Sequence, residues 1–203
     1  MSKGGTVARV SELSTDDVAE GDRDDFIKYR ELFKDFGNQV PVYAHAPIGM
    51  KHVFGMSLES SQAQTLPRRL VEIAVVATSY ANRCTYCVAH HSTILADLGL
   101  DPDAISNLGA ADVPGLTEVE LLVRDYAIAV TERSWGIRDE MFERLSAHFS
   151  ESEIVELTMR IALTGLFNTV NQALDIEMEE GLMADFTSKG LSASALEGLE
   201  DEN

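Results

Sequence analysis

The sequence predicts an all-α fold, and three patterns support this fold class. Apolar residues recur at the three- and four-residue spacing of a helix face, as in Leu70, Ile73 and Ala77. Capping-box sequences at residues 117–120 and 150–153 precede two of these apolar stretches. No segment alternates apolar and polar residues over the length of a strand. We therefore expect a single helical domain flanked by tails.

The chain of 203 residues is long enough for one domain around a single core. Residues 1–24 are acidic, with scattered apolar residues, so we expect a mobile acidic N-terminal arm; a short first helix is the alternative. Residues 25–185 are expected to form the helical domain. Residues 186–203 are rich in Ser, Gly, Ala and Glu and predict a disordered acidic tail.

The helix boundaries within the domain follow from glycines, prolines and capping residues. They predict helices at residues 25–36, 48–57, 67–80, 84–98, 102–108, 117–133, 138–149, 154–174 and 175–185. Residues 40–47 hold two prolines and are expected to be a connector. Thr65 is the predicted cap of the helix that accepts Pro67 in its first turn. The helix at 154–174 is the most apolar of the long ones, so we expect it in the core or at a subunit interface.

The charge of the chain excludes two classes of partner. Its 34 acidic and 16 basic residues give a net charge of −18, which repels nucleic acid and anionic lipid. The simplest role of this acidity is to keep the protein soluble. Apolar runs such as 73–77 are far shorter than the roughly 20 residues that span a bilayer. The first residues lack the apolar stretch of a secretory signal, and we expect a cytoplasmic protein.

The densest group of reactive side chains lies at residues 84–91, Cys-Thr-Tyr-Cys-Val-Ala-His-His. This segment holds both cysteines of the chain and two of its five histidines. On a helix, at about 100° per residue, Cys84, Cys87 and His91 fall within an arc of roughly 60°. His90 lies to one side of that arc and is assigned to packing. His91 is therefore the predicted partner of the cysteines.

A cysteine pair at the start of a helix is typical of redox chemistry. The unsatisfied amide groups at a helix N-terminus carry partial positive charge, which favours a thiolate over a thiol. Two residues between the cysteines permit a short disulfide ring. His91 follows Cys87 by one helical turn, close enough to accept its proton or to orient a water that does. The alternative is a pair of buried cysteines that only pack.

Glu72 interrupts an otherwise apolar helix. If it faces the core, burial would raise its pKa toward a value useful for proton transfer. If it faces solvent, an exposed ion pair with Arg68, four residues earlier, would explain both residues. The spacing by itself leaves both orientations open.

A metal site is the other chemistry that these residue types allow. The chain holds the side chains of a tetrahedral zinc site at Glu72, Cys84, Cys87 and His91. However, three of those ligands would have to converge from one helix face, and the chain has no second cysteine pair. A c-type haem attachment is excluded because Val88, not histidine, follows Cys87. We therefore expect no metal and no cofactor.

The pattern of Glu72, an interval of twelve, and Cys84-x-x-Cys87-x-x-x-His91 resembles the signature of the alkylhydroperoxidase D-like branch of the carboxymuconolactone decarboxylase family. The resemblance is most specific over residues 66–98 and extends more weakly over 35–185. It implies an all-helical domain of the alkylhydroperoxidase D-like type. It also implies a homo-oligomer, a trimer or hexamer, formed through helix packing.

The resemblance implies an antioxidant enzyme, a peroxiredoxin-like thiol peroxidase or disulfide oxidoreductase with a redox-active disulfide. Its substrate would be a peroxide or a disulfide, and its reductant a thiol, such as a lipoyl or thioredoxin-like protein. Position by position, Cys87 corresponds to the thiolate that attacks peroxide and Cys84 to the resolving thiol. His91 corresponds to the base beside Cys87, and Glu72 to the relay carboxylate.

Tyr86 departs from the family pattern, which has a histidine immediately before the second cysteine. A tyrosine, with an ordinary pKa near 10, can donate a hydrogen bond but is a poor base at neutral pH. The relay through Tyr86 is therefore expected to be shorter or differently routed. The alternative function is a non-redox lyase or isomerase that acts on a small carboxylate or lactone through Glu72 and His91, as in the decarboxylase branch.

Overall fold

The computed structural model describes residues 8–200, and these residues form α-helices and short 3₁₀ turns without a strand. The prediction of an all-α fold is confirmed. Contacts group the described residues into two compact units, one of residues 8–63 and 170–180, the other of 64–169 and 181–200. All the predicted site residues belong to the second unit. Among the described helices, none is long and apolar enough to cross a membrane.

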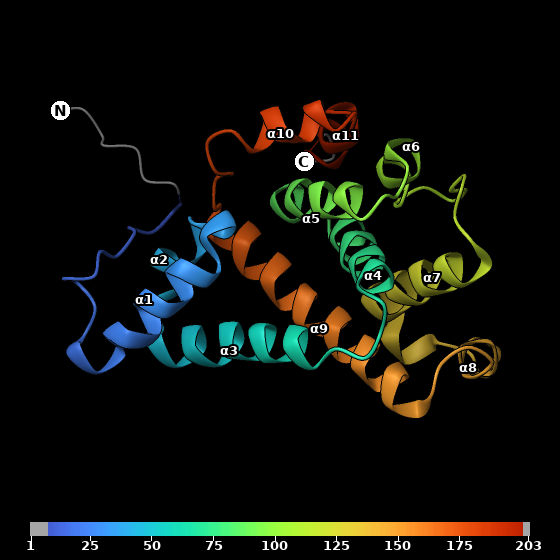
Figure 1. The fold of residues 1–203 in the computed structure, drawn as a ribbon, viewed down its shortest axis with the longest axis horizontal. Helices are drawn as coiled ribbons and strands as arrows, with labels where there is room; N and C mark the ends of the chain where they lie inside the picture. The colour runs from blue at the N-terminus through green and yellow to red at the C-terminus, as the bar shows by residue number, and fades with distance from the viewer. Residues whose placement is uncertain (1–7, 201–203) are drawn as a thin grey trace. The chain divides into compact units, whose positions relative to one another are not determined.

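Figure 1 shows the helices of the first unit as ribbons, and aromatic side chains hold these helices together. The helices are α1 (Arg23–Leu32), α2 (Gln39–Tyr43) and α3 (Pro47–Ala63), with 3₁₀ turns at Glu20–Asp22 and Lys34–Phe36. The rings of Tyr29 and Tyr43 lie 5.8 and 5.3 Å from that of Phe54, which is fully buried. Tyr29 also donates a hydrogen bond from its hydroxyl to the Lys51 carbonyl, at 3.0 Å. These contacts join α1 and α2 to α3.

The second unit is organised around α4, the most deeply buried helix of its core. Its helices are α4 (Arg68–Ala81), α5 (Thr85–Asp97), α6 (Pro102–Ser106), α7 (Glu118–Arg133), α8 (Asp139–Ser146), α9 (Glu151–Leu174, to residue 169), α10 (Leu182–Ser188) and α11 (Ser194–Glu200). A 3₁₀ turn, Ser134–Gly136, follows α7. Ile73, Ala74 and Val76 of α4 are fully buried. The main neighbours of α4 are α7 and α5, which lie next to it in Figure 1.

Both predicted capping boxes are confirmed. Thr117 Oγ1 accepts a bond from the Glu120 amide at 3.3 Å, and the Glu120 carboxylate accepts one from the Thr117 amide at 2.8 Å. Ser150 and Glu153 repeat this exchange at the start of α9, at 3.3 and 2.8 Å. Each box satisfies backbone donors that a helix start leaves without partners.

Thr65 is not the cap of α4, so that prediction is wrong. Pro67 occupies the N-cap position, and the Thr65 amide instead donates to the Glu156 carboxylate of α9 at 3.1 Å. Residues 40–47 also differ from the predicted connector, because α2 contains Pro41. That proline lies in the first turn, where an amide has no intrahelical partner to lose. The helix predicted at 48–57 is longer, since α3 runs on to Ala63.

The C-terminal elements are shifted from their predicted positions. The helix predicted at 175–185 begins only at Leu182, because Asp175 has a positive φ of 56° and Gly181, whose φ is 89°, directly precedes α10. The segment from 186 onward, predicted to be a disordered tail, contains the end of α10 and all of α11. Leu191 and Leu196 are buried, and both helices pack against α5 (Figure 1).

Parts of the predicted tails lie outside the described residues, namely 1–7 of the arm and 201–203 of the tail. In the described part of the arm, Val18 is buried and Glu20–Asp22 forms a 3₁₀ turn. The proposed domain limits at residues 24 and 185 stay predictions.

The Thr117 cap gives a direct test of how far α7 supports the second unit. Thr117→Ala removes the side chain that accepts the Glu120 amide, so we expect the free energy of unfolding to fall by about 1 kcal/mol. Urea denaturation followed by circular dichroism measures this change. Thr117→Ser keeps the capping oxygen and should remain close to the wild type. Equal stabilities of the alanine and serine variants would contradict the role of the cap.

Candidate functional site

A tight reversal between α4 and α5 positions the cysteine pair. Asn82 and Arg83 form the turn, and Arg83 has a left-handed backbone with φ of 58°. The Arg83 guanidinium donates from Nε and Nη2 to the Leu199 carbonyl of α11, at 3.1 and 2.9 Å. The Cys84 amide donates to the Ser79 carbonyl at 2.9 Å. These bonds hold the start of α5 against the end of α4.

Cys84 is the N-cap residue of α5. Its sulfur accepts a hydrogen bond from the Cys87 amide at 3.4 Å, as a capping serine oxygen would. Both cysteines are free thiols and both are buried, with 0% and 5% of their surfaces exposed. The prediction of a cysteine pair at a helix N-terminus is confirmed. The roles predicted for Cys84 and Cys87 stay predictions.

The two thiols are not equivalent in their electrostatics. The Cys87 side chain, followed by burial, raises the pKa of Cys84 well above its ordinary value. The Cys87 amide and the Asn168 side chain act in the opposite direction but are outweighed. Cys84 therefore keeps its proton at neutral pH.

His91 and Glu72 meet across the interface between α5 and α4. The Nδ1 atom of His91 lies 2.8 Å from Oε2 of Glu72, whose side chain is only 6% exposed. The core-facing orientation of Glu72 is thus the one observed. Arg68 also approaches it, with Nε 3.8 Å from Oε1, but from the solvent side, since the Arg68 side chain is 63% exposed. Glu72 is therefore a core-facing carboxylate and also forms the predicted ion pair with Arg68.

The expected upward shift of the Glu72 pKa is wrong. Burial, the largest single effect, raises the pKa, but His91, Arg160 and Arg68 together outweigh it and hold the pKa of Glu72 below its ordinary value. Glu72 is therefore ionised at neutral pH and can accept the Nδ1 proton of His91. The other ring nitrogen, Nε2, is then the one that can take up a proton.

Arg160 of α9 is a member of the site that the sequence analysis missed. Its charge lowers the pKa of Glu72, while burial lowers the pKa of Arg160 itself. Within residues 8–200 its buried Nε atom has no hydrogen-bond partner. The sequence does contain a pattern that indicates Arg160, because it is the only charged residue between 157 and 174 of a largely apolar helix.

Asn168, also from α9, fixes the back of the cysteine turn. Its Oδ1 accepts from Asn82 Nδ2 at 3.0 Å, and its Nδ2 donates to Ser79 Oγ at 3.1 Å. It also forms a side-chain hydrogen bond with Cys84. Asn168 is fully buried, and its hydrogen-bond partners at the turn belong to the same unit.

Tyr86 and His90 pack against each other on α5, with ring centroids 4.6 Å apart. Both are buried, at 4% exposure each, so the assignment of His90 to packing is confirmed. The ring contact ties Tyr86 to His90. Among the residues that the structure describes, no three His, Cys, Asp or Glu side chains converge so as to hold a metal ion.

A known protein family matches the helices that carry this site. The model of the carboxymuconolactone decarboxylase family matches residues 50–129, from within α3 to α7. Over this segment the chain is similar to members of the carboxymuconolactone decarboxylase family. A curated relative, the uncharacterized protein YdfG of Bacillus subtilis, is 25% identical over 139 residues, which are 67% of this chain and 93% of the relative.

Solved structures with the same fold extend the likeness to the alkylhydroperoxidase D-like branch. A protein of unknown function from Agrobacterium tumefaciens, provisionally assigned to antioxidant defence as AhpD, is 26% identical with a TM-score of 0.63, over 68% of this chain and 95% of that one. An uncharacterized peroxidase-related protein from Ralstonia eutropha, with an alkylhydroperoxidase AhpD core, has a TM-score of 0.73 at 21% identity, over 88% and 96%.

A third structure shows the breadth of this fold. The debrominase Bmp8, solved in complex with 2,3,4-tribromopyrrole, is similar with a TM-score of 0.68 at 20% identity, over 88% of this chain and 95% of that one. The fold is therefore shared with a debrominase as well as with peroxidase-related proteins. A likeness of fold does not identify the substrate of this chain, which depends on its own side chains.

The lowered pKa of Glu72 predicts a particular pH dependence of stability. Ionised Glu72 stabilises the fold fully above its ordinary pKa of 4.5, and this contribution is lost as the pH falls through the lower folded value. Glu72→Gln should therefore reduce the free energy of unfolding at pH 7 by about 2 kcal/mol, the usual loss for a hydrogen bond to a charged group. The gap should narrow progressively below pH 4.5.

Urea denaturation at several pH values between 3 and 7 measures that gap. Glu59→Gln, which removes an exposed carboxylate on α3, is the matched control and should follow the wild type throughout. A gap between wild type and Glu72→Gln that is constant with pH would show that Glu72 does not stabilise the fold through its charge.

Proposed function

We propose that this chain is a thiol-dependent oxidoreductase that reduces peroxides or disulfides through the Cys84 and Cys87 pair. The single observation that supports this most is the 2.8 Å contact of His91 with Glu72, on the same helix that Cys84 caps. It brings a base and its orienting carboxylate to the helix that begins with two thiols. Peroxidase-related and antioxidant names among similar structures support the same chemical class.

The first step oxidises Cys87. His91 Nε2 takes up the Cys87 proton, directly or through water, and the thiolate attacks one oxygen of the peroxide. A sulfur–oxygen bond forms and the oxygen–oxygen bond breaks, so Cys87 loses two electrons and becomes a sulfenic acid. The leaving alkoxide takes the proton from His91. Glu72 keeps Nδ1 as the donor and stabilises the imidazolium while it carries the proton.

The second step forms the disulfide. The Cys84 sulfur attacks the Cys87 sulfenic acid, the sulfur–oxygen bond breaks, and water leaves with the Cys84 proton. The raised pKa of Cys84 suits this role, because a thiol that keeps its proton does not compete with Cys87 for the peroxide. A dithiol, such as a lipoyl or thioredoxin-like protein, then returns two electrons and restores both thiols.

Arg160 is the proposed positioning residue of this relay. Its positive charge helps to keep Glu72 ionised despite burial, so Glu72 accepts from His91 and does not take the proton for itself. The guanidinium thus acts through Glu72 and not on the peroxide. Arg68, at the solvent edge, adds to the same effect.

We also propose that the protein is a homo-oligomer that associates through helix packing. Val155, Met159 and Leu166 lie on the outer part of α9 and are 61%, 51% and 40% exposed. Apolar side chains at this spacing share one helix face, and such a face is typical of a subunit interface. Light scattering of the purified protein would give the number of subunits, and a monomer at micromolar concentration would exclude the proposal.

A peroxide titration tests the proposed chemistry. One equivalent of peroxide should consume both thiols of the reduced protein and yield a single Cys84–Cys87 disulfide, detected by mass spectrometry. Cys87→Ser should abolish the reaction, whereas Cys84→Ser should trap a sulfenic acid that dimedone labels. Thiols that remain unchanged in peroxide would exclude the peroxidase, and turnover of a lactone by the double cysteine variant would favour the lyase.

Tyr86 tests whether peroxide or a disulfide is the better oxidant. Tyr86→His places a base beside Cys87, so peroxide consumption at pH 7.5 should rise severalfold, while exchange with a small aromatic disulfide should change little. Stopped-flow measurement of both rates checks this. Tyr86→Phe retains the ring that packs against His90 and is the control. A parallel rise of both rates would point to altered access to the thiols instead.

A further inference from the structure

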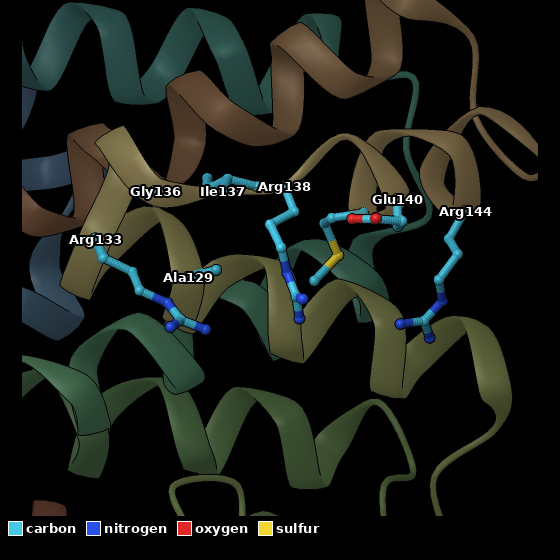
Figure 2. Close-up of a pocket in the computed structure, with 8 residues that line it drawn as sticks. Ala129, Arg133, Gly136, Ile137, Arg138, Glu140 and Arg144 are labelled. Carbon is cyan, nitrogen blue, oxygen red and sulfur yellow. The ribbon is translucent and has the colours of Figure 1, made fainter.

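A cavity of about 490 Å³ lies between the end of α7 and α8, and none of its lining residues belongs to the thiol site. Its walls come from the last turns of α7, the residues that follow it, and α8 (Figure 2). The volume falls within the range of small-molecule sites. Its lining, unlike that of most such sites, is dominated by positive charge.

Three arginines supply that charge: Arg133 of α7, and Arg138 and Arg144 at the two ends of α8. Figure 2 shows their side chains extending from separate points of the rim toward the same side. The whole chain has only 16 basic against 34 acidic residues. In the described part of the chain, none of the three forms an ion pair, and Glu140 is the only acidic side chain in the lining.

Helix stability explains two of these arginines but not the third. Arg133 and Arg144 lie in the last turns of α7 and α8, where a cation complements the helix dipole. Arg138 is the N-cap residue of α8 and forms no capping hydrogen bond there. A cation at a helix N-terminus is unfavourable, and an N-cap arginine supplies no acceptor. An anion bound in the cavity would offset this cost.

The remaining lining is apolar. Ala129 is buried, and Ile137 and Met141 are half-buried. We propose that this cavity binds a small organic anion, one that carries a phosphate or several carboxylates on a carbon skeleton. The guanidinium groups offer paired donors to the anionic oxygens, and the apolar wall contacts the carbon skeleton.

Trp135 reports on occupancy of this cavity. It is the only tryptophan of the chain, it is 86% exposed, and it precedes Gly136 of the lining. All tryptophan fluorescence of the protein therefore comes from the edge of this cavity. The signal is independent of the thiols, so it remains readable whatever their chemistry proves to be.

The test titrates the full-length protein in 0.15 M NaCl with adenosine monophosphate, citrate and, as a neutral probe, adenosine. A saturable change of tryptophan fluorescence is expected with at least one of the two anions and not with adenosine. Adenosine monophosphate alone would identify a phosphate ligand, and citrate alone a polycarboxylate. Isothermal calorimetry gives the dissociation constant independently of absorption by the nucleotide.

Substitutions then assign the binding to the cavity. Arg138→Gln and Arg144→Gln should each raise the dissociation constant by about tenfold, the loss expected for one charge-assisted contact. Arg30→Gln removes an exposed arginine of α1 and should leave it unchanged. Thermal melting verifies that each variant is folded. Absence of saturable binding by both anions, or equal affinity of all three variants, would overturn the proposal.

Discussion

The hydrogen bond between His91 and Glu72 is the contact on which the arrangement of the site depends. It joins α5, which carries the cysteines, to α4, the most buried helix of the second unit. A carboxylate inside a helical core is costly unless positive partners surround it. Arg160 and Arg68 supply positive charge and His91 supplies a hydrogen bond, and these three partners come from three different helices. The charge of Glu72 therefore organises the packing around it as well as the proposed proton transfer.

A second set of hydrogen bonds governs the cysteine turn. Asn168, Ser79 and the left-handed Arg83 hold the reversal between α4 and α5, so Cys84 caps the helix with its sulfur. Because Cys84 and Cys87 lie on one helical turn, a negative charge on one discourages a charge on the other. Geometry that is set by these hydrogen bonds thus separates the proposed roles of two chemically identical side chains.

The C-terminal helices belong to the frame of the site. Arg83 bonds to the Leu199 carbonyl of α11, and Lys189 Nζ, in the loop after α10, lies 2.8 Å from Asp97 of α5. Both contacts hold the helix of the cysteines from its outer side. The segment is poor in apolar residues, but Leu191 and Leu196 meet an apolar surface that only the folded unit presents. A composition typical of disorder is overridden by these few contacts.

Local signals determined much of this protein. Helical periodicity and two capping boxes were sufficient for the fold class, because each depends on neighbours a few residues apart. The spacing of Glu72 and His91, by contrast, left the orientation of Glu72 open. Arg160 and the direction of the Glu72 pKa required the tertiary structure. Both depend on α9, which comes much later in the chain, meeting Glu72, and no local pattern encodes that encounter. The sequence by itself determined which residues are candidates for the site, and the packing of distant helices decided the charge of Glu72.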